Sequence, residues 1–474
     1  MGPIRDKPQL IRYLREAAEI EHQLMIQYLY AGYSLKKRPD ERCSAAQFEL
    51  VRRWGSTLLM VARQEMEHLA LVNGLLTAMG AEPWYDRENI PRQSRYFLGK
   101  SLAAERAPSG KVKPCDIPFV FERFNLATIG RFVCMESPGY DTLQKSGDPI
   151  PRWCFSDDDH PCPSTSAAER RSGNLAAAAA PYALSATHLE AESVAPGSIQ
   201  ELYHRIQKAV NELPKLFTGN PNRQVFVPVE YQINVTPITD VASANLAIDL
   251  IVEEGEGIDA PPGYQSHFKR FYDLHEELAA ELKRDPRFEP SLPLPVNPRP
   301  EKITDPFARR LFDLFNYTYA TLLFVLTALY RDYQPVASQS YPFWSSALQE
   351  TAFGPAMTML LRPMAEVLAH ARSGDGERTT GPSYHLSRDD RKLLARHDPR
   401  RLGNVDFFLD RLTHVIGELE ALSAADLLKV ARSEGDVPFL KRQLAFVHES
   451  ASAIANNLRR IYQIGQLPQF VVSP

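Results

Sequence analysis

Two apolar stripes with helical spacing, each interrupted by acidic residues, constrain the fold of this chain more than any other feature. The longer stripe advances in steps of three and four, and only two of its members are polar, Glu65 and His68. Its members are Val51, Trp54, Leu58, Val61, Glu65, His68, Val72, Leu75 and Met79. Residues three apart share one side of a helix, so both polar side chains point into the same core. The preceding stripe is interrupted by Glu21, and its members are Leu10, Leu14, Ala17, Glu21, Leu24, Tyr28 and Ala31. The pattern predicts two paired helices with carboxylates and an imidazole on their buried faces.

A metal is the simplest partner for these buried acids. Burying a carboxylate without a compensating charge costs several kcal/mol or more, and neither stripe contains Lys or Arg. A Glu on one helix and Glu-x-x-His on the next form half of a carboxylate-bridged dinuclear site in a four-helix bundle. For a single Glu-x-x-His, hydrogen-bonded or surface-tilted acids are the commoner arrangement, but the agreement of two stripes favours a metal. Glu67 lies off the stripe and is expected to point elsewhere.

The segments that carry these residues resemble the ferritin-like superfamily, including a Tyr28 one heptad after Glu21. More narrowly, the chain is similar to the ferritin-like domain of the iminophenyl-pyruvate dimer synthases of violacein- and rebeccamycin-type pathways. The similarity extends over roughly residues 8 to 275, and the matching segments are 18–31, 64–81, 135–138, 198–203, 247–257, 266–271 and, further on, 380–384. The resemblance implies an all-α, ferritin-like four-helix bundle with a long crossover, here followed by an additional C-terminal helical region.

Apolar periodicity and turn residues predict the order of elements. Helices are expected at 8–37, 44–79, 121–136, 199–213, 240–256, 265–284, 305–333, 343–372, 388–397, 404–433 and 437–463, with a short β-like patch at 224–235. Six prolines between 286 and 300 mark a stiff linker. We therefore predict a ferritin-like domain at 1–289, with an insertion at 81–197, and a C-terminal helical domain at 301–474. The Ala- and Ser-rich stretch 163–197 is typical of a disordered segment or a lid.

The remaining metal ligands are expected from later helices. Glu136 continues the apolar spacing of its helix directly before Pro138, and a buried acid that holds a loop is the alternative. The resemblance favours Glu201 although its helix face is charged. His267 is expected as the second imidazole, with a capping or core role as the alternative. The full predicted ligand set is Glu21, Glu65, His68, Glu136, Glu201, Glu256 and His267, with Tyr28, Glu253 and His204 as outer or alternate ligands. Catalytic residues are not predicted.

Composition narrows the class of partner. The 474 residues carry 54 basic and 58 acidic side chains, a net charge of -4 that gives no footprint for nucleic acid. The apolar stretch 311–330 is interrupted by acids and amides and is expected to be a buried helix rather than a membrane span. Five scattered cysteines indicate neither a disulfide framework nor a zinc site, and a cytoplasmic location fits best. The cluster from Cys154 to Cys162 is expected to be a solvated loop.

Carboxylate and imidazole ligands without thiolate favour two iron ions, or manganese, and chemistry with O₂ or peroxide. We therefore expect a dinuclear metal oxidase or oxygenase acting on an amino-acid-derived small molecule, and the resemblance suggests oxidative coupling of imines in secondary metabolism. Two alternatives are an iron-oxidising, iron-handling protein and a non-catalytic interaction protein stabilised by a metal. The sequence identifies neither the substrate nor the oligomeric state, and it leaves a heme and a homo-oligomer open.

Overall fold

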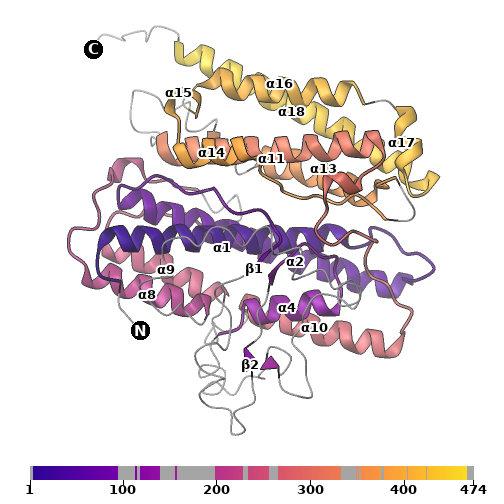
Figure 1. Ribbon diagram of the computed structural model, residues 1–474, viewed down its shortest axis with the longest axis horizontal. Coiled ribbons are helices and arrows are strands. Elements are labelled where there is room, and N and C mark those ends of the chain that lie inside the picture. Colours follow the sequence, from indigo (N-terminus) through magenta and orange to yellow (C-terminus); the bar gives the residue numbers. More distant parts are fainter. Residues whose placement is uncertain are drawn as a thin grey trace, which may run out of the picture. The chain divides into compact units, whose positions relative to one another are not determined.

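The computed structural model describes residues 4–93, 113–114, 118–138, 155–156, 198–227, 233–255, 265–332, 348–349, 351, 354–374, 378–402, 404–422 and 424–466 (Figure 1). The chain forms two compact units. Unit 1 comprises Met1–Leu69, Glu88–Leu216 and Asp240–Leu292, and unit 2 comprises Ala70–Arg87, Phe217–Thr239 and Pro293–Pro474. Helices dominate both units, which confirms the predicted all-α class.

Unit 1 is built on two long helices, α1 (Lys7–Ser34) and α2 (Ala45–Ala78). The last turns of α2, from Ala70 on, belong to unit 2. The Asp6 side chain caps α1 by accepting a hydrogen bond from Gln9 N at 2.7 Å. Ser44 and Gln47 form a reciprocal capping box at the start of α2. The first helix ends three residues earlier than predicted, because Leu35 turns into an extended bridge with Ser291.

Two shorter helix pairs complete the bundle of unit 1. Helix α4 (Leu126–Met135) packs along α10 (His267–Arg284), and α8 (Ile199–Glu212) packs along α9 (Val241–Gly255). Figure 1 shows the two pairs toward opposite ends of α1. Helix α4 was predicted as part of the crossover, but it belongs to the bundle. Each helix of the second hairpin is therefore divided in two. Helices α4 and α8 together form its first arm, and α9 and α10 together form its second.

Unit 2 is also helical. Its elements are α11 (Pro306–Asp332), the π-helical turn η6 (Ala356–Leu361), α13 (Arg362–His370), α14 (Arg388–Arg396), α15 (Pro399–Leu402), α16 (Val405–Glu420), α17 (Ala424–Val430) and α18 (Val437–Gln466), with 3-10 turns at Pro221–Arg223, Pro300–Lys302 and Glu434–Asp436. The predicted single helix 404–433 is thus two helices, because α16 ends at Glu420. Of the predicted helix 343–372, the described part forms η6 and α13.

Helix α11 is the core of unit 2. It contacts η6, α13, α14, α15, α16 and α17. By length and hydropathy it could cross a membrane, but 83% of its most apolar window is buried inside the structure. This burial agrees with the predicted core helix. Arg87 is also buried here and donates hydrogen bonds to the Tyr319 hydroxyl at 3.2 Å and to the Tyr384 carbonyl.

The strands are minor. Strand β1 (Arg92–Gln93) pairs with β3 (Pro118–Phe119), and β2 (Lys113–Pro114) pairs with β4 (Phe155–Ser156), both antiparallel. The described part of the β-like patch at 224–235 contains a single bridge, between Val227 and Val235. The predicted insertion 163–197 and the Cys154–Cys162 cluster lie outside the described residues, apart from β4.

The division into units differs from the predicted domains in one respect. Unit 1 ends at Leu292, inside the Pro-rich linker, but 70–87 and 217–239 cluster with unit 2. Local contacts within unit 2 explain this: Tyr330 donates to the Ala70 carbonyl at 2.8 Å, and Gly219 N donates to the Ala78 carbonyl at 2.9 Å. The end of α2 is therefore held by residues far apart in the sequence.

One cysteine departs from the prediction. Cys43 is a buried free thiol, as expected, whereas Cys134 on α4 is disulfide-bonded. The scattered spacing of the cysteines predicted no disulfide framework, and it could not reveal this single bond, because spacing along the chain does not report distance in the fold.

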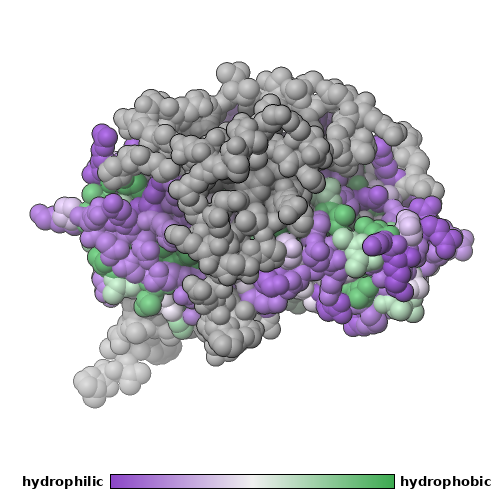
Figure 2. Space-filling view, turned by 90° about the horizontal axis from the view of Figure 1, so that it is seen from below, coloured by the Kyte–Doolittle hydropathy of each residue, from purple (hydrophilic) through white to green (hydrophobic). Residues whose placement is uncertain are grey.

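The described surface is mainly hydrophilic on the face shown in Figure 2, where hydrophobic residues form small separate areas. Five large hydrophobic side chains among the described residues are exposed: Phe226, Val241, Leu246, Leu428 and Phe446. Isolated residues of this kind are normal on a protein surface.

Candidate metal centre

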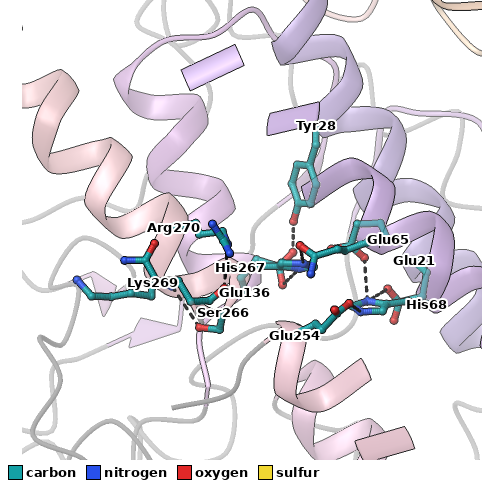
Figure 3. A network of polar contacts seen from close by, with 12 residues as sticks. Glu21, Tyr28, Glu65, His68, Glu136, Glu254, Ser266, His267, Lys269 and Arg270 are labelled. Carbon is teal, nitrogen blue, oxygen red and sulfur yellow. Dashed lines mark hydrogen bonds and ion pairs between the residues drawn. The ribbon is translucent and has the colours of Figure 1, made fainter. Parts of the chain in front are cut away.

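The first half of the centre comes from α1 and α2. Glu21, Glu65 and His68 are all at most 2% exposed, as the two stripes predict. The Nδ1 atom of His68 lies 3.5 Å from Glu21 Oε2 and 3.5 Å from Glu65 Oε2. Two carboxylates from different helices therefore face one imidazole nitrogen (Figure 3).

The second half comes from the ends of α4 and α10. Asn125 caps the start of α4, and Glu136 follows its last residue, with its N–H donating to the Phe132 carbonyl. Ser266 caps α10, so His267 is the first residue of that helix. The Nδ1 atom of His267 lies 2.9 Å from Glu65 Oε1 and 3.7 Å from Glu136 Oε2. Both residues were predicted, and both are buried.

Glu65 lies between the two imidazoles. Its Oε2 faces His68 and its Oε1 faces His267, and the two rings are stacked with centroids 5.4 Å apart. Neither Glu65 oxygen makes a hydrogen bond, and His267 Nδ1 makes none either, although it lies 2.9 Å from Glu65. Glu65 Oε1 and His267 Nδ1 are thus close together but are not aligned for a hydrogen bond. This arrangement suits a cation that both atoms bind.

Two buried phenols hold the outer carboxylates. The Tyr203 hydroxyl, on α8, donates to Glu21 Oε1 at 2.5 Å. The Tyr28 hydroxyl, on α1, donates to Glu136 Oε1. The ring of Tyr28 packs against Phe132 and Phe271, with centroids 4.6 and 4.9 Å away. Each phenol leaves the second carboxylate oxygen facing the imidazoles, so each fixes the direction in which its carboxylate binds.

Each imidazole also has an oxygen on its far side. His68 Nε2 lies 3.2 Å from Glu254 Oε2, and His267 Nε2 lies 3.3 Å from Gln64 Oε1. Histidines that bind a metal usually donate their other ring N–H to such an oxygen, which fixes the tautomer that leaves the binding nitrogen free. The arrangement therefore assigns Nδ1 of both rings to the centre.

Burial and mutual charge interactions shift the pKa values of the acids and imidazoles in this cluster, so that protons neutralise part of its negative charge. Burial, followed by the charge of Glu136, raises the pKa of Glu65 to about 8. Burial lowers the pKa of His267, but the charge of Glu65 outweighs it and raises the pKa to about 9. Burial opposes ionisation of Glu21, yet its hydrogen bond and charge interaction with His68 lower its pKa. Protons and a metal would therefore compete for the same atoms.

Some predicted ligands lie elsewhere. Glu201 forms an ion pair with Arg205 in the first turns of α8, at 2.5 Å, and His204 is exposed. Glu201 is half-buried and makes this ion pair on the charged face of its helix, the face that its periodicity indicates. Glu253 is exposed on α9, and its neighbour Glu254 contributes instead. Glu256 lies outside the described residues.

Sequence reasoning missed Tyr203, Glu254 and Gln64. Tyr203 was taken as an apolar residue of its helix face, and a phenol on that face was the signal for a buried hydrogen-bond donor. Glu67 is off the stripe, as predicted, but it is 5% exposed and therefore buried rather than solvated.

The residues present fit a bound metal. Glu65, His68 and His267 each offer one ligand atom within 4.8 Å of the others. The contacts of Glu21, Glu65 and Glu136 within the described residues are to imidazoles, phenols and one another, with no Lys or Arg among them. A set of oxygen and nitrogen donors without thiolate suits iron or manganese.

A family model described as Ferritin-like matches residues 14–276, which include every residue of this centre. The chain belongs to the ferritin-like family. The match confirms both the predicted resemblance and the predicted bundle.

Two relatives match most of this chain. Dichlorochromopyrrolate synthase from Lentzea aerocolonigenes is 28% identical over 435 residues, which cover 81% of this chain and 36% of the relative. A 2-imino-3-(indol-3-yl)propanoate dimerase from Chromobacterium violaceum is 29% identical over 420 residues, which cover 80% and 34% respectively. The chain thus spans about a third of the length of these curated relatives. A solved ferritin-like protein from Caulobacter vibrioides covers 74% of this chain at 17% identity with a TM-score of 0.42.

Proposed function

We propose that this chain binds two redox-active metal ions, iron or manganese, and with them oxidises a small amino-acid-derived molecule. The observation that supports the proposal most strongly is Glu65, whose two oxygens face two different imidazole Nδ1 atoms without hydrogen bonds. Such a pair of ions, when bound, supplies the electron transfer needed to oxidise a substrate with O₂ or peroxide.

The chain's own residues hold and insulate this centre. Glu65 would be the shared ligand, Glu21 and Glu136 would be the outer carboxylates, and His68 and His267 would supply one nitrogen each. All five are at most 3% exposed, so bulk water does not compete for their lone pairs. The carboxylates are therefore positioned before a metal arrives, which reduces the reorganisation that binding requires.

For the substrate we propose a 2-imino acid with an aromatic side chain, in line with the name of the relative from Chromobacterium violaceum. In the reaction, two substrate molecules each lose one C–H hydrogen and one C–C bond forms between them. The two electrons and two protons pass to peroxide, which gives two waters, or to O₂, which gives peroxide. The product is therefore a dimer lighter by two hydrogens than two substrates.

The test generates the imine enzymatically in the assay mixture. An L-amino-acid oxidase acting on L-tryptophan or L-phenylalanine supplies the imine and peroxide, and mass spectrometry follows the dimer. We expect dimer with the Fe- or Mn-loaded chain, and none with the loaded His267→Ala variant. His204→Ala, which removes an exposed histidine, is the matched control and should keep activity. A loaded wild-type chain that consumes neither O₂ nor peroxide with any such imine contradicts the proposed oxidation.

Iron handling is the second outcome of the same assay. A chain that oxidises many equivalents of Fe(II) in rapid turnover and accumulates a mineral core, without converting the imine, would be an iron-handling protein. This result would support the proposed metal centre and contradict the proposed substrate.

A further inference from the structure

We propose that Glu254 and Gln64 make the two metal positions unequal, so that one position binds its ion first and more tightly. The inference rests on the proposed metal centre. We define the α1 position by Glu21 and His68 and the α4 position by Glu136 and His267, with Glu65 shared between them.

The two positions have the same kinds of inner ligand and differ in the chemistry of their outer partners. Each has one imidazole Nδ1, one oxygen of Glu65 and one outer carboxylate. Each outer carboxylate accepts a hydrogen bond from a buried tyrosine, Tyr203 at the α1 position and Tyr28 at the α4 position. The inner ligands therefore give no reason for one position to be the stronger.

The outer oxygens differ in charge. At the α1 position, His68 Nε2 faces a carboxylate, Glu254 Oε2, at 3.2 Å. At the α4 position, His267 Nε2 faces a neutral amide oxygen, Gln64 Oε1, at 3.3 Å. The contact of Glu254 is buried, since Glu254 is 8% exposed, whereas Gln64 is half-buried, and both rings are at most 2% exposed.

Glu254 acts through the His68 ring rather than on the metal itself. It faces Nε2, whereas Glu21 and Glu65 face Nδ1 across the ring. A carboxylate that accepts the Nε2–H makes the imidazole a more basic ligand, and an amide does so less. It also adds one negative charge near the α1 position. Glu254 is therefore a positioning residue that strengthens His68 as a donor.

The structure thus predicts stepwise filling. The α1 position should take the first ion, and the α4 position the second, with lower affinity. Loss of a carboxylate partner behind a metal-bound histidine typically weakens metal binding 10- to 100-fold. We expect a Glu254→Gln substitution to weaken the first step by about that factor and to bring the two steps together.

The test is an anaerobic titration of the metal-free full chain with Co²⁺ alone, followed by its visible absorption and by calorimetry. Glu254→Gln should weaken the first step, Gln64→Glu should strengthen the second, and the double variant should invert the order. Glu253→Gln, which changes an exposed neighbour on the same helix, is the matched control and should leave both steps unchanged. Two variants identify which position each binding step belongs to. His68→Ala should remove the tight step, and His267→Ala should remove the weak step.

The outcomes separate the two proposals. A wild-type chain that binds neither Co²⁺ nor Fe²⁺ refutes the metal centre, and the inequality with it. Two ions bound with equal affinities in wild type, Glu254→Gln and Gln64→Glu refute the inequality alone. Gln64→Glu keeps the proposal open to refutation even if Glu254→Gln does not fold, since it adds a charge to an otherwise native chain.

Discussion

Metal binding to this centre should release about two protons per chain at pH 7. Without a metal, burial and Glu136 raise the pKa of Glu65 to about 8, and the charge of Glu65 raises that of His267 to about 9 against the effect of burial. Neither group can offer a lone pair to a metal until it loses its proton. The protons bound at neutral pH must therefore leave as the metal enters.

The magnitude follows from the two pKa values. At pH 7, a pKa of about 8 leaves roughly ten protonated Glu65 side chains for each ionised one, and the ratio for His267 is roughly a hundred to one. The protonations are coupled, because, against burial, the charge of Glu65 is what raises the pKa of His267. Together with His68, whose pKa is also raised, the cluster therefore holds about two protons in total at pH 7, and these are released. Since each released proton contributes about a factor of ten per pH unit, affinity should rise about 100-fold from pH 6 to pH 7 and level off above pH 9.

Calorimetric titration with Co²⁺ in buffers of different ionisation enthalpy measures the number of protons released. The His267→Ala variant, which should still bind one ion, cannot hold the His267 proton, so it should release about one proton fewer. No release at pH 7, together with an affinity that is the same at pH 6 and pH 7.5, would show that the cluster is already ionised and would refute this reasoning.

Three further variants test separate contacts. Tyr28→Phe removes the hydrogen bond to Glu136 and should lower the unfolding free energy of the metal-free chain by about 1–2 kcal/mol, as measured in urea. His267→Ala should reduce bound iron to at most one ion per chain by elemental analysis, whereas exposed His204→Ala should not, and equal losses would contradict the site. Arg87→Met leaves buried oxygens in unit 2 without their donor, so it should destabilise the chain by about 2–3 kcal/mol with unchanged metal content.

Periodicity predicted the part of the site that lies within regular helix. Glu21, Glu65 and His68 interrupt long apolar stripes, so their direction follows from the 3.6-residue repeat. Glu136 could be predicted in the same way, because it follows directly after α4 on the same spacing. Several helices were placed to within a few residues for the same reason, whereas the predicted helix 404–433 is two helices and α4 begins five residues later than predicted.

Periodicity stops being informative where a helix ends. Three acids, Glu253, Glu254 and Glu256, lie around Gly255, the last residue of α9, and only the fold shows that Glu254 faces His68. The split of the second hairpin was also beyond prediction, because it depends on which distant helices pack together. Gln64 has no sequence signal of its own, since an amide beside a predicted ligand is equally typical of a surface position.

The central claim is that Glu65 is shared by two metal ions, and anomalous diffraction from crystals grown with Mn²⁺ or Fe²⁺ tests it most directly. The account predicts two peaks, each within roughly 2.0–2.3 Å of one Glu65 oxygen and of one imidazole Nδ1. One should lie beside His68 and Glu21, and the other beside His267 and Glu136. A single peak on one side of Glu65, no peak at all, or a peak bound by Glu201 and His204 would contradict it.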